Sequence, residues 1–365
     1  MSARGEGVAE RERRKLEIIE RARAKPARFT DARVTLAHGA GGRATRGLVE
    51  GLLVPAFGSA TLSELDDAAP VAGADPEVMV TTDSYVVKPI RFPGGSIGGL
   101  AVNGTVNDLA VSGARALALT LALVLEEGLE ADELRAEIEA IAAAAELAEV
   151  EVVAGDAKVV ERTKADKMYV CTSGIGRRDR RARLAPSSIL PGDRILLSGT
   201  IGDHGMAIML ARGEFDLTAE IESDSRSLWP VAEALIEAAG SDLRCMRDPT
   251  RGGVASALNE LARASGVSMH LSESAVPMRP AVAGAAELLG IDPMHVANEG
   301  KLVAFSSPDA ADDALDAMRS VPGCEEAAQI GEVSSEAPGM VLVETPLGGR
   351  RVMDELVGDP LPRIC

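Results

Sequence analysis

Residues Ala114–Leu125 restrict the fold more than any other stretch of this chain, because they are apolar throughout except for Arg115 and Thr120. We interpret them as one long β-strand. Such a strand has almost no polar side chain to present to water, so both of its faces should be buried. A barrel made from the sheets of two subunits would bury both faces, and we therefore expect the chain to form a homodimer.

Segments with helical and strand patterns alternate on both sides of this strand. In 131–148, for example, Leu134, Ile138 and Ile141 recur on one face of a helix. We predict strands at 33–38, 78–82, 114–125, 150–154, 168–175, 194–198, 267–271, 302–306, 327–333 and 340–344. We predict helices at 44–57, 97–111, 131–148, 205–212, 228–239, 253–265, 281–290 and 310–320. The mixture indicates an α/β (α+β) fold.

The length of 365 residues suggests two domains. Residues 177–192 are basic at first and then rich in Pro and Ser, a change of composition that is typical of a domain boundary. We expect a charged N-terminal arm, two α/β domains and a mobile C-terminal tail. These parts cover residues 1–33, 34–185, 186–345 and 346–365.

Composition excludes several classes of function. The chain has 38 Lys and Arg against 56 Asp and Glu, a net charge of −18, so it should repel nucleic acid. We expect no association with membranes, because no apolar run reaches the roughly 18 residues of a transmembrane helix. The charged start is no secretory signal, and the four cysteines show no CxxC spacing. A reduced, cytoplasmic protein fits these observations.

Acidic residues follow the ends of several predicted strands or begin loops, each flanked by small or apolar residues. They are Asp66, Asp67, Asp83, Asp108, Asp156 and Asp248, and Asn107 precedes one of them. Carboxylate and amide oxygens suit Mg²⁺, which would in turn hold the phosphates of a nucleotide. The chain has no P-loop motif, so the pattern predicts a metal–triphosphate site of a different design. Residues Thr250, Arg251 and Gly252 follow the last of these aspartates.

A glycine-rich segment, His38–Ala44, lies between a predicted strand and a predicted helix. Backbone amides of His38, Gly39, Gly41 and Gly42 could approach a phosphate at the helix N-terminus. A tight strand-to-helix turn explains the same glycines about as well. The segment also fits the loose dinucleotide pattern GxGxxA, which by itself is weak support for a nicotinamide enzyme.

The last residue of the chain is a cysteine. Pro360 and Pro362 favour an extended approach to Cys365, which would present the thiol rather than fold it away. Arg363 favours the thiolate, and the adjacent terminal carboxylate opposes it. Lys158, two residues after Asp156, and Glu299, before a glycine and a strand, are further candidates for chemistry, although each also fits an ordinary surface or turn position.

These motifs, in this order, resemble those of the HypE family of hydrogenase maturation proteins, within the aminoimidazole-ribonucleotide-synthetase-like superfamily. The resemblance covers about residues 33–365. Its most specific stretches are SGTIGDHG and the terminal PRIC, and RDPTRGGV and ANEGKLV also carry it. It implies a two-domain fold in which the N-terminal domain binds ATP and pairs its sheet with that of a second subunit. The charged arm and Ala157, where the family commonly has Thr, depart from the pattern.

The family dehydrates a thiocarboxamide on its own C-terminal cysteine to a thiocyanate, with ATP and Mg²⁺. The thiocyanate supplies the cyanide ligand of nickel–iron hydrogenase. Carried over to this sequence, Cys365 would be the carrier, and Lys158 or Glu299 the base. The metal ligands would be Asp83, Asp108 and Asp248. Nucleotide contacts would come from His38, Gly39, Gly41, Gly42, Asp66, Asp67, Asn107, Asp156, Thr250, Arg251 and Gly252. The implied partners are the carbamoyltransferase HypF and the HypC–HypD scaffold complex.

Two other functions compete with this interpretation. One is a different ATP-dependent enzyme of the superfamily, similar to selenophosphate synthetase or a purine synthetase. Such an enzyme needs no terminal cysteine, and a selenophosphate synthetase would need a reactive residue near the N-terminus, whereas the first cysteine here is Cys171. The other is a scaffold that displays a thiol without catalysis, which should not hydrolyse ATP.

Overall fold

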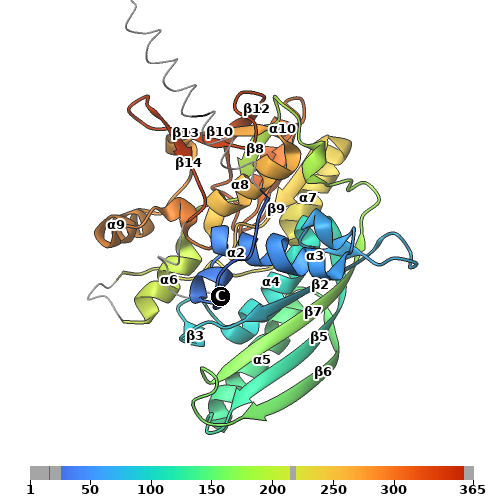
Figure 1. Cartoon of the computed structure of the whole chain (residues 1–365), viewed down its shortest axis with the longest axis vertical. Coiled ribbons are helices and arrows are strands. Elements are labelled where there is room, and N and C mark those ends of the chain that lie inside the picture. Colours follow the sequence, from blue (N-terminus) through green and yellow to red (C-terminus); the bar gives the residue numbers. More distant parts are fainter. Residues whose placement is uncertain (1–15, 17–25, 214–218, 357–365) are drawn as a thin grey trace, which may run out of the picture.

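The computed structural model describes Leu16, residues 26–213 and residues 219–356. Two sheets with their helices divide these residues into two units (Figure 1). The first sheet has the order β1-β2-β7-β5-β6. Its strands are β1 (Ala69–Pro70), β2 (Val78–Tyr85), β5 (Ala114–Glu126), β6 (Glu151–Val160) and β7 (Met168–Arg178). All pairs are antiparallel except β5 with β6, which are joined through a helix.

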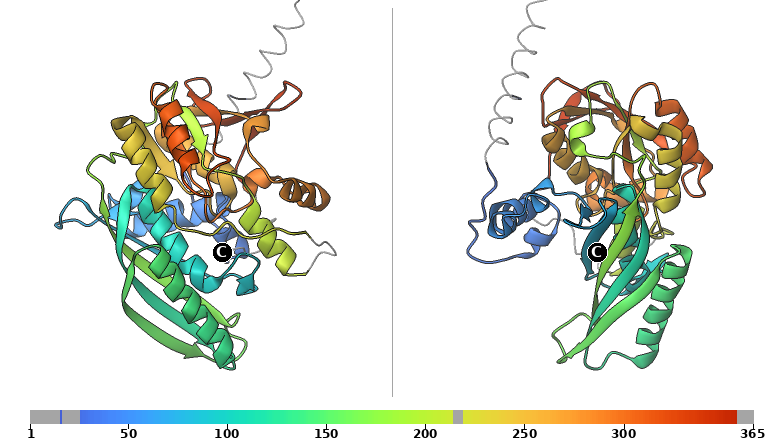
Figure 2. Two further views of the ribbon diagram at one scale, coloured as in Figure 1. Left: turned by 180° about the vertical axis from the view of Figure 1, so that it is seen from behind. Right: turned by 90° about the vertical axis from the view of Figure 1, so that its right-hand side faces the viewer.

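Helices α4 (Ile97–Val111) and α5 (Ala131–Leu147) cover one face of this sheet (Figure 2). A short hairpin of β3 (Arg91–Phe92) and β4 (Gly95–Ser96) leads into α4. Helix α4 consists of small and apolar residues and is buried almost all round, between the sheet and the second unit. It ends before Gly113, whose φ of +76° suits a residue without a side chain. Both helices were predicted, and both are confirmed.

No helix covers the opposite face of the sheet among the described residues (Figure 1). Val80, Ile175 and Ala118 are in register on neighbouring strands and therefore share a face. Ile175 is 43% exposed, and Leu117 on the same strand as Ala118 is 50% exposed. The predicted strand 114–125 is confirmed, but a single chain buries only one of its faces. We call the uncovered side the open face.

The second unit is a seven-stranded sheet of order β14-β13-β10-β12-β8-β11-β9. Its strands are β8 (Arg194–Leu197), β9 (Leu243–Arg247), β10 (Ser268–Ser272), β11 (Val303–Ser306), β12 (Ala328–Ser334), β13 (Val341–Glu344) and β14 (Arg350–Met353). The helices are α6 (Asp203–Ala211), α7 (Trp229–Ala239), α8 (Gly253–Ser265), α9 (Pro280–Leu289) and α10 (Ala311–Ser320). Helix α8 packs in one apolar core, and α7 with α10 in another, on the two sides of the sheet.

The strand predicted at 33–38 is wrong. Residues Leu36–Gly39 form a 3-10 helix instead, and a helical stretch follows as α2 (Arg43–Leu48), a π-helical turn (Val49–Leu53) and α3 (Val54–Phe57). The Thr35 backbone N–H donates to Nδ1 of His38 at 3.0 Å, which closes a turn on the segment. Local bonds between side chain and backbone compete with strand pairing in this way. The helix predicted at 44–57 is confirmed.

The part of the predicted tail that the structure describes is packed, which corrects the expectation that 346–365 forms no structure. Strand β14 pairs with β13, and Met353 is buried. Beyond it, Arg263 pairs with Glu355, and the Arg43 backbone N–H donates to the Leu356 carbonyl. The chain is therefore fixed up to Leu356. Residues 357–365, with Cys365, and most of the charged arm lie outside the described residues.

Shorter 3-10 helices lie at Leu62–Glu64, Pro186–Ser188, Gly240–Asp242, Glu273–Ala275 and Pro293–His295. Among the described helices, none combines the length and the apolar character that crossing a bilayer would require.

Candidate active site

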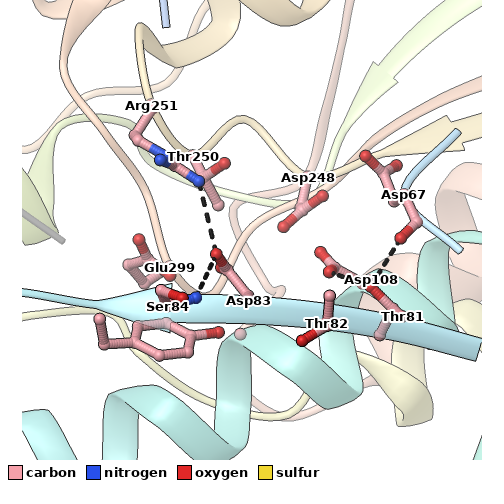
Figure 3. A pocket seen from close by; sticks show the side chains of 12 residues that line it. Asp67, Thr81, Thr82, Asp83, Ser84, Asp108, Asp248, Thr250, Arg251 and Glu299 are labelled. Carbon is pink, nitrogen blue, oxygen red and sulfur yellow. Dashed lines mark hydrogen bonds and ion pairs between the residues drawn. The ribbon is translucent and has the colours of Figure 1, made fainter. Parts of the chain in front are cut away.

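A cavity of about 200 Å³ opens between the two units (Figure 3). Strand β2, helix α4, the loop after β9 and the loop before β11 all contribute to its wall. It is lined by Asp67, Thr81, Thr82, Asp83, Ser84, Tyr85, Gly104, Asp108, Asp248, Thr250, Arg251 and Glu299. Seven of these residues were predicted as site residues, so the structure brings most of the acidic set together.

Three carboxylates, Asp67, Asp108 and Asp248, converge at one end of the cavity, and we call them the acidic trio. One oxygen from each lies within 4.8 Å of the others. Asp108 comes from the rigid helix α4, and Asp248 directly follows β9. The hydroxyl of Thr81 on β2 lies 2.8 Å from both Asp108 Oδ2 and the Asp67 carbonyl oxygen, which fixes the two relative to the sheet.

Burial and mutual repulsion disfavour ionisation of the trio. Burial is the main cause that raises the pKa of Asp248, to about 7, and the charge of Asp67 adds to it. The pKa of Asp108 is raised well above its usual value, by burial and then by Asp248 and Asp67. Hard oxygen ligands that concentrate negative charge at one point match a divalent cation such as Mg²⁺. The chemistry of this donor set therefore fits the ion that the sequence predicted.

Arg247 decides which of the two adjacent aspartates joins the trio. Its Nη1 atom lies 2.7 Å from Asp67 Oδ1, whereas Nη2 is 4.0 Å from Asp66 Oδ1. Asp67 lines the cavity and Asp66 does not. The sequence left these two candidates open, and the structure places Asp67 at the site.

Asp83 was predicted as a metal ligand, but the structure places it beside Arg251 rather than in the trio. Arg251 Nη2 lies 3.5 Å from Asp83 Oδ1, and that oxygen also accepts the Ser84 backbone N–H at 2.7 Å (Figure 3). Glu299 lies in the same part of the cavity and is 3% exposed. Burial, followed by the charges of Asp248 and Asp224, raises the pKa of Glu299 well above its usual value.

The glycine-rich segment lies next to the cavity without lining it. The buried imidazole of His38 pairs with Asp31 at 3.1 Å. A side chain on Gly41 would come within 2.5 Å of the Arg251 carbonyl oxygen, so the glycine allows close packing there. Gly39 and Gly42 belong to the same turn, and Gly252 has φ +78° at the start of α8. The described geometry favours a structural turn over phosphate contact.

Three further predicted residues lie elsewhere. Asn107 is buried and uses its amide on backbone groups of residues 226, 228 and 299, so it does not face the cavity. Asp156 and Lys158 form an exposed ion pair of 2.6 Å on β6. They are in register with Ala122 and Val124 of β5 and so belong to the open face, on the side of the sheet away from α4.

The sequence reasoning missed Thr81, Thr82, Ser84, Tyr85 and Gly104 as cavity residues. Alternation along β2 could have indicated Thr81 and Tyr85, since both share a face with Asp83. The need for glycine at position 104 is visible only in the structure, because a side chain there would come within 2.2 Å of the Tyr85 hydroxyl.

The raised carboxyl pKa values predict a cation effect that depends on pH. Protonated carboxyls stabilise the fold below about pH 4, and this contribution is lost as the pH rises to about 7, the folded pKa of Asp248. A bound cation offsets that loss. Mg²⁺ should therefore raise the melting temperature more at pH 8 than at pH 6, measured by scanning fluorimetry against Na⁺ at equal ionic strength. Equal shifts at both pH values would contradict the expectation.

Comparisons with known proteins find relatives over nearly the whole chain. Residues 65–178 match the N-terminal domain, and residues 191–343 the C-terminal domain, of AIR synthase related protein. Carbamoyl dehydratase HypE of Bradyrhizobium diazoefficiens is 47% identical over 332 residues, which cover 91% of this chain and 96% of that protein. Carbamoyl dehydratase HypE of Escherichia coli K12 is 41% identical over 338 residues, with 91% and 99% covered.

Solved structures of HypE proteins also match this chain. A HypE–HypF complex matches with a TM-score of 0.81 at 42% identity, covering 85% of this chain and 99% of that chain. HypE in complex with ATP matches with a TM-score of 0.76 at 43% identity, covering 91% and 100%. Thiamine monophosphate kinase of Aquifex aeolicus, at 17% identity and a TM-score of 0.60, shares the fold alone. The expected two-domain fold is confirmed.

Proposed function

Since this chain belongs to the HypE family of carbamoyl dehydratases, we propose that it uses ATP to convert the S-carbamoyl group on its own Cys365 into a thiocyanate. The product supplies the cyanide ligand for the iron of nickel–iron hydrogenase. The terminal cysteine sets this function apart from other enzymes of the superfamily, which do not need one.

The reaction balances without an oxidant or reductant. The carbamoyl oxygen attacks the γ-phosphorus of ATP, and ADP leaves. The carbon–oxygen bond then breaks with release of phosphate, and the nitrogen loses its two protons, which leaves a carbon–nitrogen triple bond on sulfur. Phosphorylation is needed because an amide oxygen is a poor leaving group. Cavity residues therefore have to hold phosphate charge and accept protons.

The observation that carries the proposal is the composition of the cavity. The acidic trio lies at one end, and Arg251 with the buried Glu299 lies at the other, within about 200 Å³. Asp67, Asp108 and Asp248 would hold Mg²⁺, which neutralises phosphate charge when bound. Arg251 and Thr250 would contact the phosphates. Asp83 stays a candidate for a further cation, because it lines the same cavity.

Glu299 is the base that we favour, for two reasons. It lies in the cavity of its own subunit, and its raised pKa makes its carboxylate a stronger base than an ordinary glutamate. Lys158 is exposed on the open face, so it could reach a reacting group only across a subunit interface. We assign Lys158 and Asp156 to the cavity of a partner subunit.

The open face supports a homodimer. It exposes apolar side chains of β2, β5 and β7 that a second sheet would cover. The cavity is also smaller than the roughly 300–1,000 Å³ of a typical ligand pocket, so part of ATP would extend beyond it. We propose that the second subunit completes the nucleotide site.

Ile175→Glu should convert the dimer into a monomer at micromolar concentration. The substitution places a charge at the centre of the open face, where pairing would bury it without a partner. Light scattering measures the mass. The control is Leu147→Glu, at an 85% exposed position at the end of α5, on the covered side of the sheet. A wild-type chain that is only monomeric at micromolar concentration would contradict the proposed dimer.

The partners follow from the same family. We propose that HypF loads the carbamoyl group, consistent with the known HypE–HypF complex, and that a HypC–HypD complex accepts the cyanide. The three described cysteines are free thiols, which favours the reducing cytoplasm.

Intact mass spectrometry tests the reaction. Incubation with HypF and carbamoyl phosphate should add one carbamoyl group, and ATP should then remove one water from the adduct. An adduct that ATP leaves unchanged would contradict the proposal, as would ATP hydrolysis without loss of water.

A further inference from the structure

The backbone of Glu299 is held on both sides by buried side chains from other parts of the chain. Asp224 Oδ1 accepts the Glu299 backbone N–H at 3.0 Å. Asn107 Nδ2 donates to the Glu299 carbonyl oxygen at 3.2 Å. Asn107 adjoins Asp108 on α4, so the same helix carries a member of the acidic trio and fixes Glu299. The carboxylate of Glu299 therefore projects from a peptide with little freedom to shift.

The carboxylate of Asp224, which accepts the Glu299 N–H, is itself paired with Lys301, two residues after Glu299. Lys301 Nζ lies 3.2 Å from Asp224 Oδ2, and the two side chains are only 6% and 3% exposed. Between them in the chain, Gly300 leaves no room for a side chain, because a Cβ atom would come within 1.8 Å of the Asp224 carbonyl oxygen. Residues 299–301 thus lie directly on the loop that carries Asp224.

The charges around Asp224 keep it ionised. Burial alone would raise its pKa, but Lys301 and His204 outweigh burial, and the pKa of Asp224 is lowered. His204 comes from α6, and its Nδ1 lies 2.8 Å from Ser223 Oγ. Asp203, on the same helix, is paired with Arg279. The GDHG stretch that marks the family in sequence therefore packs behind the Asp224 loop and away from the cavity lining.

We propose that the buried Asp224–Lys301 ion pair is a positioning device that holds Glu299 in reach of the reacting carbamoyl nitrogen. The inference rests on the proposed role of Glu299 as the base. Buried ion pairs contribute little net stability compared with apolar residues, so stability alone is a poor reason for this pair. Placement of a catalytic group is a better reason, since a displacement of about 1 Å can cost on the order of 100-fold in rate.

The test compares Lys301→Gln, Asp224→Asn and the double variant D224N/K301Q, loaded with carbamoyl groups by HypF and given saturating ATP. Each single variant should lower the single-turnover rate of dehydration by about 10- to 100-fold, with the KM for ATP unchanged. The double variant should recover most of the rate, because its pair is neutral and the introduced asparagine keeps an oxygen that can accept the Glu299 N–H. A wild-type rate in both single variants would overturn the inference.

Two controls separate a loss of positioning from a loss of stability and from a wrong choice of base. Arg244→Gln breaks another largely buried pair of the second unit, with Asp193 at 3.7 Å, and should lower the melting temperature without changing the rate. Glu299→Gln tests the premise. If it dehydrates normally, the proposed base and this inference both fail. If it is inactive while Lys301→Gln and Asp224→Asn are normal, only the positioning role fails.

If Lys301→Gln does not fold, Lys301→Arg provides a second test. It keeps the charge on a side chain of different length, so it should lower kcat while leaving the KM for ATP unchanged. An unchanged kcat in Lys301→Arg, together with no loss in Asp224→Asn, would equally overturn the inference.

Discussion

Replacing Cys365 with alanine should eliminate both carbamoyl loading and thiocyanate formation, while ATP binding and the melting temperature stay at wild-type values. The proposed substrate is a group on this sulfur, and alanine has no atom at this position that could carry it. A carrier must be nucleophilic and accessible. The described thiols are poorer candidates, since burial raises the pKa of Cys245 to about 12 and also raises that of Cys324. Digestion of loaded protein and mass spectrometry of its peptides locate the adduct.

Cys171→Ala is the matched control, because Cys171 is the only described cysteine that is not fully buried. It should load and react normally. Adding residues after Cys365 should impair the reaction, since they would have to enter the site with the thiol. An adduct on Cys171, or full activity of Cys365→Ala, would contradict the carrier role.

Asp248→Asn should lower ATP turnover by at least about 100-fold. The substitution removes one charge of the acidic trio and one of its cation ligands, while the side chain keeps its size. Asp67→Asn should weaken the binding of Mg²⁺ more than Asp83→Asn does, because only Asp67 belongs to the trio. Turnover over a Mg²⁺ series measures both effects.

Asp312→Asn, at an exposed position on α10, is the control for a lost negative charge and should be neutral. If Asp248→Asn turns over ATP at the wild-type rate, the cation site has been assigned to the wrong residues.

Local patterns in the sequence predicted most of the fold. The small-residue helix 97–111 and the apolar strand 114–125 have the predicted boundaries within a residue, because each is a continuous run rich in small and apolar residues that is bounded by glycine and polar residues. Strands β9 and β14 were missed. Strand β9 alternates poorly because it is buried on both sides, and β14 is an Arg-rich edge strand whose one partner among the described strands is β13. Such strands depend on a partner more than on their own residues.

Long-range contacts explain where the predicted site residues lie. Asp67 joins the trio because Arg247, 180 residues later in the chain, holds it in place. Asn107 looked like an oxygen ligand, yet its amide binds backbone groups more than 100 residues away. The type of side chain in the sequence indicated suitable chemistry, whereas its orientation depended on neighbours that are distant in the sequence.

The fixed end of the chain at Leu356 turns the substrate into a tethered one. Only nine residues, 357–365, follow this anchor. Whatever path they take, Cys365 stays within about 32 Å of Leu356. A tether this short gives a local concentration on the order of millimolar, which dilution of the protein does not change. Catalysis by this chain on its own tail should therefore follow first-order kinetics at any protein concentration at which the proposed dimer persists. Scarcity of the protein would limit delivery of cyanide rather than its synthesis.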